Sequence, residues 1–387
     1  MKKDGRHKWA KVRYAVDILP LVSEAPAVPT TSVKFLRNLL SDRLHSLPIM
    51  ILYLTDGCNS RCVTCDIWRS PRRDMDMALV DAIAADMSAL AVRWAVLSGG
   101  EAMQHPHWPQ IARRLRDEGA RVMLLTNGLL LRKQIAEVLA SVDDVIVSLD
   151  AGTPPTYTAI RGVDAFDLVL EGIRAVRAGG LPVTTRTTVQ RANYAEIPQI
   201  IEVARAADVN SISFLTVDVS NPFAFGPRFE HDAALPLIAS NGAGAPAEHG
   251  PPAAALTHAD LDHLRQVLDD VEARFADDFA SGRIAESPAK LRQMIGYFGA
   301  ILGEATPPPI RCNAPHLSAV IEVDGTLRPC YFLPEGGRVG EGSPLRDAIN
   351  TPQALELRRQ YQSGQRPECA RCVCPLYKGP RALLQMR

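Results

Sequence analysis

Three cysteines near residue 60 have the spacing of a metal-binding loop. Cys58, Cys62 and Cys65 follow the pattern C-x3-C-x2-C, directly after an apolar run that predicts a strand. Three closely spaced thiolates can bind three corners of a cubane cluster and leave the fourth iron open to a substrate or cofactor. A closed zinc site would need a fourth Cys or His nearby, and the nearest histidine, His45, precedes the strand. We expect an iron–sulfur cluster, with zinc or accidental clustering as the alternatives.

A second group of cysteines follows residue 311. Its members are Cys312, Cys330, Cys369, Cys372 and Cys374. Asp324-Gly325, a favoured tight-turn dipeptide, lies between the first two and predicts a hairpin that brings Cys312 and Cys330 to the same end of a small sheet. Cys369 and Cys372 form a C-x2-C pair. Two such pairs can close a metal site completely, which fits a second iron–sulfur cluster or, as the alternative, a structural zinc ribbon.

Strands and helices alternate through the first half of the chain. Apolar or β-branched runs predict strands at 49–54, 94–98, 122–126, 145–149, 183–189 and 211–215. Apolar residues at helical spacing predict helices at 77–90, 108–118, 131–140, 165–178 and 197–207. This alternation is typical of parallel βαβ units, in either a barrel or an open sheet. Six repeats would make a partial barrel.

Polar or glycine-rich sequences follow four of the predicted strands. After the strand that precedes the cysteine loop, the next three end in SGGE (98–101), TNG (126–128) and SLD (148–150). Because functional residues of such folds lie at the C-terminal edge of the sheet, these strand ends describe one pocket. A glycine at a strand end is by itself most often a turn former.

Composition excludes several classes of partner. The 387 residues contain 43 Lys plus Arg and 43 Asp plus Glu, so no net charge draws the protein to nucleic acid or to an anionic membrane. The basic start is not followed by the apolar stretch of a secretory signal, and no run is long enough for a membrane span. We therefore expect a cytoplasmic protein, where clustered cysteines are more often metal ligands than disulfides.

The chain divides into four predicted regions. Residues 1–46 form an N-terminal extension, 47–220 the partial barrel, 221–305 a linker or lid with helices, and 306–387 a small cysteine-rich domain. Residues 239–257 are rich in Ala, Gly and Pro and indicate a flexible linker. Thr257 is then the predicted N-cap of a helix whose capping box includes Asp260.

The cysteine loop and the strand-end motifs together resemble the radical S-adenosylmethionine (SAM) superfamily over roughly residues 49–216. The resemblance implies an α/β fold, a partial (β/α)6 TIM-like barrel. It also implies a [4Fe-4S] cluster on Cys58, Cys62 and Cys65, whose open iron binds SAM. Reductive cleavage of SAM in this family gives a 5′-deoxyadenosyl radical, so the cofactor supplies the hard chemistry and the protein supplies position and shielding.

The same resemblance implies roles for the strand ends. Gly99, Gly100 and Glu101 are similar to the motif that receives the methionyl amino group of SAM. Asn127, Ser148 and Asp150 belong to elements that resemble those lining the nucleoside and ribose. Arg186 is similar in placement to a basic residue that pairs with the SAM carboxylate.

The C-terminal cysteines resemble the auxiliary-cluster domains called twitch and SPASM. The hairpin pattern of these domains is present as Cys312, Gly325 and Cys330. The resemblance implies a small α+β domain with an auxiliary [4Fe-4S] cluster on Cys312, Cys330, Cys369 and Cys372. A full SPASM pattern has seven cysteines for two clusters, so the five cysteines here favour the one-cluster twitch form. Cys374 stays outside this ligand set: it is an inert neighbouring thiol, a ligand in place of Cys369 or Cys372, or the candidate catalytic residue, as a hydrogen-atom donor.

The expected function is a radical SAM oxidoreductase that abstracts a substrate hydrogen atom and passes an electron to the auxiliary cluster. The expected partners are an electron donor such as flavodoxin or ferredoxin and a peptide or small natural-product or sugar-like substrate. The alternatives are a redox-neutral radical SAM epimerase or lyase, an iron–sulfur electron carrier or sensor without a substrate, and a zinc-stabilised scaffold.

Overall fold

The computed structural model describes residues 30–221, 251–379 and 382. Most of the expected N-terminal extension (residues 1–29) and most of the expected flexible linker (residues 239–250) lie outside these described residues. The strands form one sheet in the order β6-β5-β4-β3-β2-β1-β7-β8-β9. None of the helices in the described ranges combines the length and the apolar character needed to cross a membrane.

Six parallel strands form the barrel part of the sheet, in chain order. They are β1 (Ile49–Thr55), β2 (Trp94–Gly99), β3 (Arg121–Thr126), β4 (Asp144–Ser148), β5 (Val183–Val189) and β6 (Ser211–Thr216). Their apolar side chains are buried because helices cover the outer face, as parallel sheets require. The sequence predicted each of these strands, and the fold is the expected partial (β/α)6 barrel.

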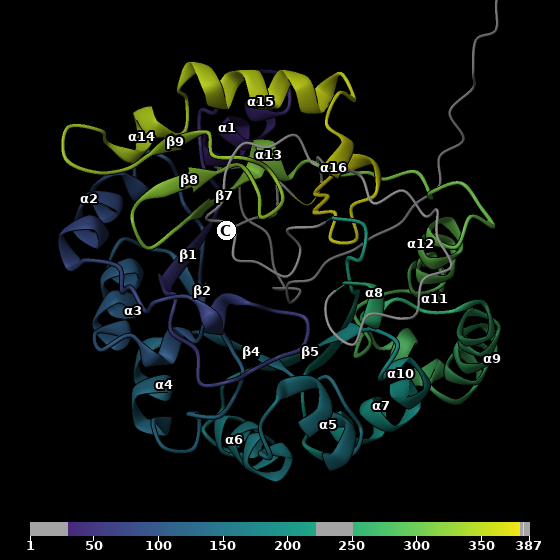
Figure 1. The fold of residues 1–387 in the computed structure, drawn as a ribbon. Helices are drawn as coiled ribbons and strands as arrows, with labels where there is room; N and C mark the ends of the chain where they lie inside the picture. Colours follow the sequence, from purple (N-terminus) through teal and green to yellow (C-terminus); the bar gives the residue numbers. More distant parts are fainter. Residues whose placement is uncertain (1–29, 222–250, 380–381, 383–387) are drawn as a thin grey trace, which may run out of the picture.

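The covering helices lie outside the strands, and Figure 1 shows them as a ring around the sheet. They are α2 (Met77–Met87), α3 (Trp108–Asp117), α4 (Ile135–Ser141), α5 (Pro154–Arg161), α6 (Phe166–Ala178) and α7 (Ile197–Ala206). Short 3-10 helices η1 (Ile67–Arg69), η2 (Ala102–Gln104) and η3 (Tyr194–Glu196) lie in the connecting loops. Five of the ring helices match the predicted helices, and α5 does not.

Helix α5 was not predicted because its signals are weak. Its sequence, PPTYTAIR, is short and rich in proline and threonine. The two prolines occupy the first turn, where a missing N–H costs nothing. Gly162 ends the helix with φ of 67°, the left-handed conformation that favours glycine. Tyr157 and Ile160 are fully buried, so tertiary packing stabilises a segment with little periodicity of its own.

The C-terminal part of the chain extends the same sheet. Strand β7 (Ser318–Ile321) pairs in parallel with β1, and β8 (Thr326–Arg328) and β9 (Gly337–Arg338) follow in antiparallel pairing. The turn between β7 and β8 contains Gly325 with φ of 83°, which confirms the hairpin predicted from Asp324-Gly325. A side chain at Gly325 would overlap the Val339 carbonyl, a second reason for glycine there.

A helical segment follows the barrel. It contains α8 (Pro251–Ala254), α9 (His258–Arg274), α10 (Ala276–Ala280), α11 (Pro288–Leu291) and α12 (Gln293–Ile301). The Thr257–Asp260 capping box at the start of α9 is present, as predicted. Ile284 forms a parallel bridge with Ile212, so residues 283–286 lie along the open edge of β6.

A buried arginine joins the N-terminal segment to the C-terminal helices. The remaining helices are α1 (Thr30–Asn38), α13 (Ala314–Leu317), α14 (Leu345–Ala348), α15 (Pro352–Gln362) and α16 (Pro367–Ala370). Arg358 of α15 is 1% exposed and donates to the carbonyls of Pro315, Asp42 and Ile349 at 2.9, 3.0 and 2.7 Å. Burial lowers its pKa to about 10, so the guanidinium stays charged at neutral pH.

We expect Arg358→Met to lower the free energy of unfolding by about 2–4 kcal/mol, because three carbonyls lose a charged donor. Chemical denaturation of the purified chain measures this change. The neighbouring variant Arg359→Met is the control, since Arg359 is exposed and pairs with Asp42 at the surface. It should change stability little. Equal stability of the two variants would contradict the role given to Arg358.

Candidate active site

The first cysteine loop lies between the end of β1 and η1, and its thiols are close together. Cys58, Cys62 and Cys65 are all partly buried, and their charges act on one another. Burial raises the pKa of Cys58 to about 11 and that of Cys65 to about 12. Iron binds the thiolate, so loading this loop must release protons. Three thiols that lie close together on one loop fit an iron–sulfur cluster.

The glycine-rich end of β2 packs on the backbone of this loop. Gly100 donates to the Thr55 carbonyl at 2.7 Å, and Glu101 donates to the Gly57 carbonyl at 2.8 Å. Gly99 has φ of 118°, and a side chain there would lie 2.5 Å from the Thr55 oxygen. A side chain at Gly100 would overlap Gly57. The two glycines therefore allow two loops to pack backbone to backbone.

Glu101 holds the end of β3. Its carboxylate accepts from the Thr126 hydroxyl at 2.9 Å, the Asn127 N–H at 2.7 Å and the Met103 N–H at 3.1 Å. The side chain is 1% exposed. Burial raises the pKa of Glu101, and the three donors oppose this change.

The TNG sequence reaches the cysteine loop through Asn127. Its side-chain amide donates to Asn59 Oδ1 at 2.8 Å and lies 3.8 Å from Cys58 Sγ. The backbone N–H of Gly128 donates to the Thr126 hydroxyl at 3.0 Å, which closes the turn. The predicted SGGE and TNG residues thus lie with the first cysteine group, as the strand-end argument indicated.

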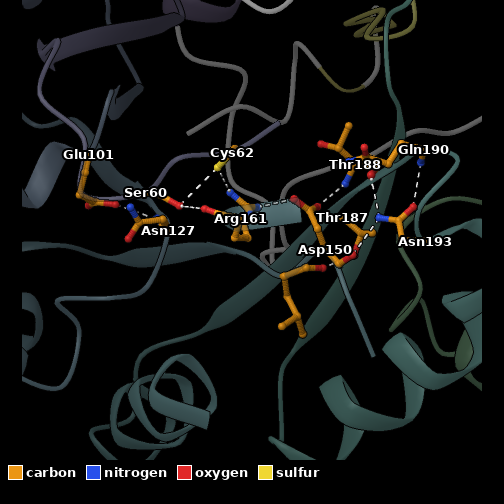
Figure 2. Close-up of polar contacts among 11 residues, drawn as sticks. Ser60, Cys62, Glu101, Asn127, Asp150, Arg161, Thr187, Thr188, Gln190 and Asn193 are labelled. Carbon is orange, nitrogen blue, oxygen red and sulfur yellow. Dashed lines mark hydrogen bonds and ion pairs between the residues drawn. The ribbon is translucent and has the colours of Figure 1, made fainter. Parts of the chain in front are cut away.

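Asp150, after β4, is buried and its carboxylate is fully engaged. One oxygen pairs with Arg161 Nη2 at 2.6 Å, and the other accepts from the Thr188 N–H at 2.7 Å. Asn193 donates to the Asp150 carbonyl at 2.8 Å and also to that of Thr188. Figure 2 shows this network running from Asn193 through Asp150 and Arg161 to Cys62.

Arg161 is a site residue that sequence reasoning missed. Its Nη1 lies 3.5 Å from Cys62 Sγ, and the Ser60 hydroxyl lies 3.4 Å from the same sulfur. Burial disfavours the guanidinium charge, but Asp150 and Cys62 outweigh burial and raise the pKa of Arg161. A signal existed in the Arg-Gly pair at 161–162, which ends a helix, but α5 was not predicted.

Arg186 lies on β5, between the neighbouring strands β4 and β6. It is in register with Ser148 of β4 and Ser213 of β6. Its Nε is buried without a hydrogen-bond partner within the described residues. The nearby Glu286 is buried and accepts from the Ser213 hydroxyl and the Phe214 N–H at 2.9 and 2.8 Å. Burial raises the pKa of Glu286, while these donors and Arg186 lower it.

Four C-terminal cysteines surround Tyr361 of α15. Burial raises the pKa of this tyrosine, and Cys312, Cys369, Cys330 and Cys372 each raise it further. The Tyr361 hydroxyl donates to the Cys312 carbonyl. The hairpin and the C-x2-C pair therefore come together as predicted, and Tyr361 is a neighbour that the sequence did not indicate.

Cys374 differs from the other seven cysteines because it alone is exposed. Enclosure by neighbouring protein raises the pKa of its thiol, Arg186 and Lys290 lower it, and Glu286 raises it. Cys374 also acts on Cys372. It therefore lies between the second cysteine group and the charged residues of β5 and α11.

Within the described ranges, no three Cys, His, Asp or Glu side chains converge as the ligands of a single metal ion do.

Family comparisons agree with these groups. Residues 52–204 match the model of the radical SAM superfamily, and residues 312–373 match that of the iron–sulfur cluster-binding SPASM domain. The AdoMet-dependent heme synthase of Methanosarcina barkeri is 34% identical over 158 residues, which are 39% of this chain and 45% of that protein. A probable GTP 3′,8-cyclase of Saccharolobus islandicus is 35% identical over 189 residues, 46% of this chain and 59% of that protein. The chain thus matches about half the length of these relatives.

Solved structures share the fold over most of the chain. Streptococcus suis SuiB bound to S-adenosylmethionine covers 90% of this chain and 80% of its own, with a TM-score of 0.58 and 14% identity. The enzyme anSMEcpe, with bound AdoMet and a peptide, covers 86% of this chain and 89% of its own, with a TM-score of 0.57 and 15% identity. The two family matches show a radical SAM domain followed by a SPASM-type iron–sulfur domain, which implies the use of SAM and of [4Fe-4S] clusters, and the solved structures share the fold.

Proposed function

We propose that this enzyme is an oxidoreductase that removes hydrogen from a peptide substrate. Cys58, Cys62 and Cys65 would hold the SAM-binding cluster, and Cys312, Cys330, Cys369 and Cys372 would hold one auxiliary cluster. When bound, the first cluster with SAM would supply a 5′-deoxyadenosyl radical that takes a substrate hydrogen atom, and the auxiliary cluster would accept the electron left as the substrate radical loses a proton to solvent. Flavodoxin or ferredoxin would provide the reducing electron.

One observation carries the SAM site: the ends of β2 and β3 bond directly to the cysteine loop. Glu101 N–H donates to Gly57, while Asn127 contacts Cys58. These contacts place the strand-end polar groups beside the thiols, where a chelated SAM would meet them. Gly99, Gly100 and Glu101 would orient its methionyl part, and Asn127 would line its nucleoside. A carrier or sensor without a substrate would need no such polar groups.

Arg186 and Ser148 would face the SAM carboxylate and nucleoside from β5 and β4. The buried Nε of Arg186 has no hydrogen-bond partner in the described structure. This donor is therefore available to bind an anionic group. Asp150 is already bonded to Arg161 and Thr188. Its contact with the ribose would therefore be indirect, through the loop that it holds.

A peptide substrate is favoured over a small molecule because the match to a structure with a bound peptide covers more of this chain. SuiB, in a structure with its precursor peptide SuiA, covers 84% of this chain. The heme synthase and the cyclase match less than half of it.

The eight free cysteines suit the reducing conditions of the cytoplasm.

A redox-neutral epimerase is the second candidate, and Cys374 favours it. Its thiol is exposed and adjoins Arg186, Lys290 and Glu286. A thiol in such a place can return a hydrogen atom to a substrate radical.

With only five C-terminal cysteines, the domain would hold one cluster, as in the twitch form.

The central test replaces Cys58, Cys62 and Cys65 together by Ala. We expect loss of SAM cleavage, measured as 5′-deoxyadenosine released anaerobically with dithionite as reductant. Bound iron should fall by about four per chain, as one cubane requires. The remaining visible absorbance, from the C-terminal cluster, is the control for folding. Cleavage by the triple variant would overturn the proposed function.

Glu101→Ala should weaken SAM binding on the order of tenfold to a hundredfold, because its buried carboxylate holds the Thr126 hydroxyl and the Asn127 and Met103 N–H groups at the site, and a charged hydrogen bond contributes about 1.5–3 kcal/mol. Equilibrium dialysis of the loaded enzyme with SAM measures the dissociation constant. Glu196→Ala is the control: Glu196 also accepts from three donors, which are the Gly152 N–H and the hydroxyls of Thr153 and Thr156. Equal affinity in both variants would reduce Glu101 to a structural residue.

Because the proposed cluster has its four ligands in Cys312, Cys330, Cys369 and Cys372, Cys374→Ala should keep the full iron content. Iron quantitation checks this against Cys372→Ala, which should lose about four irons per chain. Loss of iron from the Cys374 variant would make it a ligand and would exclude the hydrogen-donor role.

A further inference from the structure

The buried ion pair between Arg161 and Asp150 lies against one thiol of the first cysteine loop. Arg161 Nη2 is 2.6 Å from Asp150 Oδ2, and Nη1 is 3.5 Å from Cys62 Sγ (Figure 2). The two side chains are 11% and 5% exposed, so water screens their charges little. A permanent cation is thus held at hydrogen-bond distance from a sulfur.

Backbone contacts fix the geometry of this thiol relative to α5. The N–H of Arg61 donates to the Arg161 carbonyl at 3.0 Å, and that of Val63 donates to the Ile160 carbonyl at 2.9 Å. The Ser60 hydroxyl donates to the same Arg161 carbonyl at 2.9 Å. Gly162 ends α5 so close to the loop that a side chain would lie 2.5 Å from the Arg61 oxygen. The residues on both sides of Cys62 are therefore bound to the end of α5.

Asp150 is held just as firmly from the other side. The carboxylate oxygen that does not pair with Arg161 accepts from the Thr188 N–H at 2.7 Å. The backbone carbonyl of Asp150 accepts from the Asn193 side chain at 2.8 Å. Asn193 is itself held by the Gln190 N–H at 2.8 Å. The guanidinium therefore cannot turn away from Cys62 without breaking a network anchored on β5.

We propose that Arg161 is a positioning residue that holds the Cys62 thiolate and raises the reduction potential of the cluster bound there, and that Asp150 limits this rise. Hydrogen bonds to cluster sulfurs and nearby charge set cluster potentials. One-electron reduction adds a negative charge to the cluster, and a cation beside its ligand favours the reduced form. The carboxylate of Asp150 opposes that effect. This inference depends on the proposed cluster at Cys58, Cys62 and Cys65.

A second arginine–aspartate pair, with a buried carboxylate and a partly exposed guanidinium, provides the control. Arg121 at the start of β3 forms a two-point ion pair with Asp144 at the start of β4. Asp144 and Asp150 flank the same strand, but Asp144 lies at its N-terminal end, away from the cysteine loop. Removing Arg121 therefore costs a comparable ion pair without changing the surroundings of Cys62.

The experiment is a redox titration of the anaerobic full-length enzyme without SAM, followed by electron paramagnetic resonance. The spectrum of the triple variant lacking Cys58, Cys62 and Cys65 is subtracted to remove the C-terminal cluster. For Arg161→Gln we expect the ratio of reduced to oxidised cluster at a fixed potential to fall at least tenfold, a shift of about −59 mV for one electron. Asp150→Asn should shift the potential in the opposite direction, and Arg121→Gln should leave it unchanged.

Opposite shifts at one ion pair separate charge tuning from a loss of structure, which would move both variants in the same direction. Wild-type potential in a fully iron-loaded Arg161→Gln enzyme would overturn the inference. If that variant takes up no iron, Asp150→Asn decides: a higher potential supports the inference and an unchanged one overturns it. Failure of the proposed function would look different, because the triple variant would then keep the wild-type iron content and signal.

Discussion

The site depends on one constraint: a cysteine loop without regular structure must be held in place by backbone contacts from elsewhere in the chain. The end of β2 bonds to it at Thr55 and Gly57, and the end of α5 bonds to it at Arg61 and Val63. Both contacts need glycine, at Gly100 and at Gly162, because a side chain at either position would collide with loop backbone. The glycines at this edge therefore serve the packing of the loop before they serve any ligand.

The parallel pairing of β1 with β7 places both cysteine groups on one framework. Strand β1 leads into the first cysteine loop, and the β7–β8 hairpin leads to Cys330. Arg358 ties α15 to the segment before β1, and α15 also carries Tyr361 beside the second cysteine group. The two groups are thus linked through a continuous sheet and through α15, which Arg358 anchors. Such a link suits an enzyme whose two cofactor sites must keep a constant separation.

Much of this arrangement could be predicted because it depends on local sequence patterns. The alternation of apolar runs located the six barrel strands, and Asp324-Gly325 located the hairpin. What local pattern could not predict is which distant residues complete the site. Arg161 is 99 residues from Cys62, and its helix is too short and too rich in proline and threonine to show a period. Tyr361 was missed for the same reason, since only the fold brings it to the four cysteines.

The two buried arginines of this protein show how surroundings decide what a charge does. Arg358 is bonded to three carbonyls, and burial lowers its pKa, which is the behaviour of a cation that serves packing. Arg161 instead faces a carboxylate and a thiol, and both raise its pKa despite burial. A carbonyl partner keeps its partial charge whatever the enzyme does, whereas the charge on a cluster and its thiolates changes with each electron. A guanidinium beside Cys62 would therefore stabilise the two redox states of a cluster bound there unequally, and the carboxylate that fixes its position would reduce that difference.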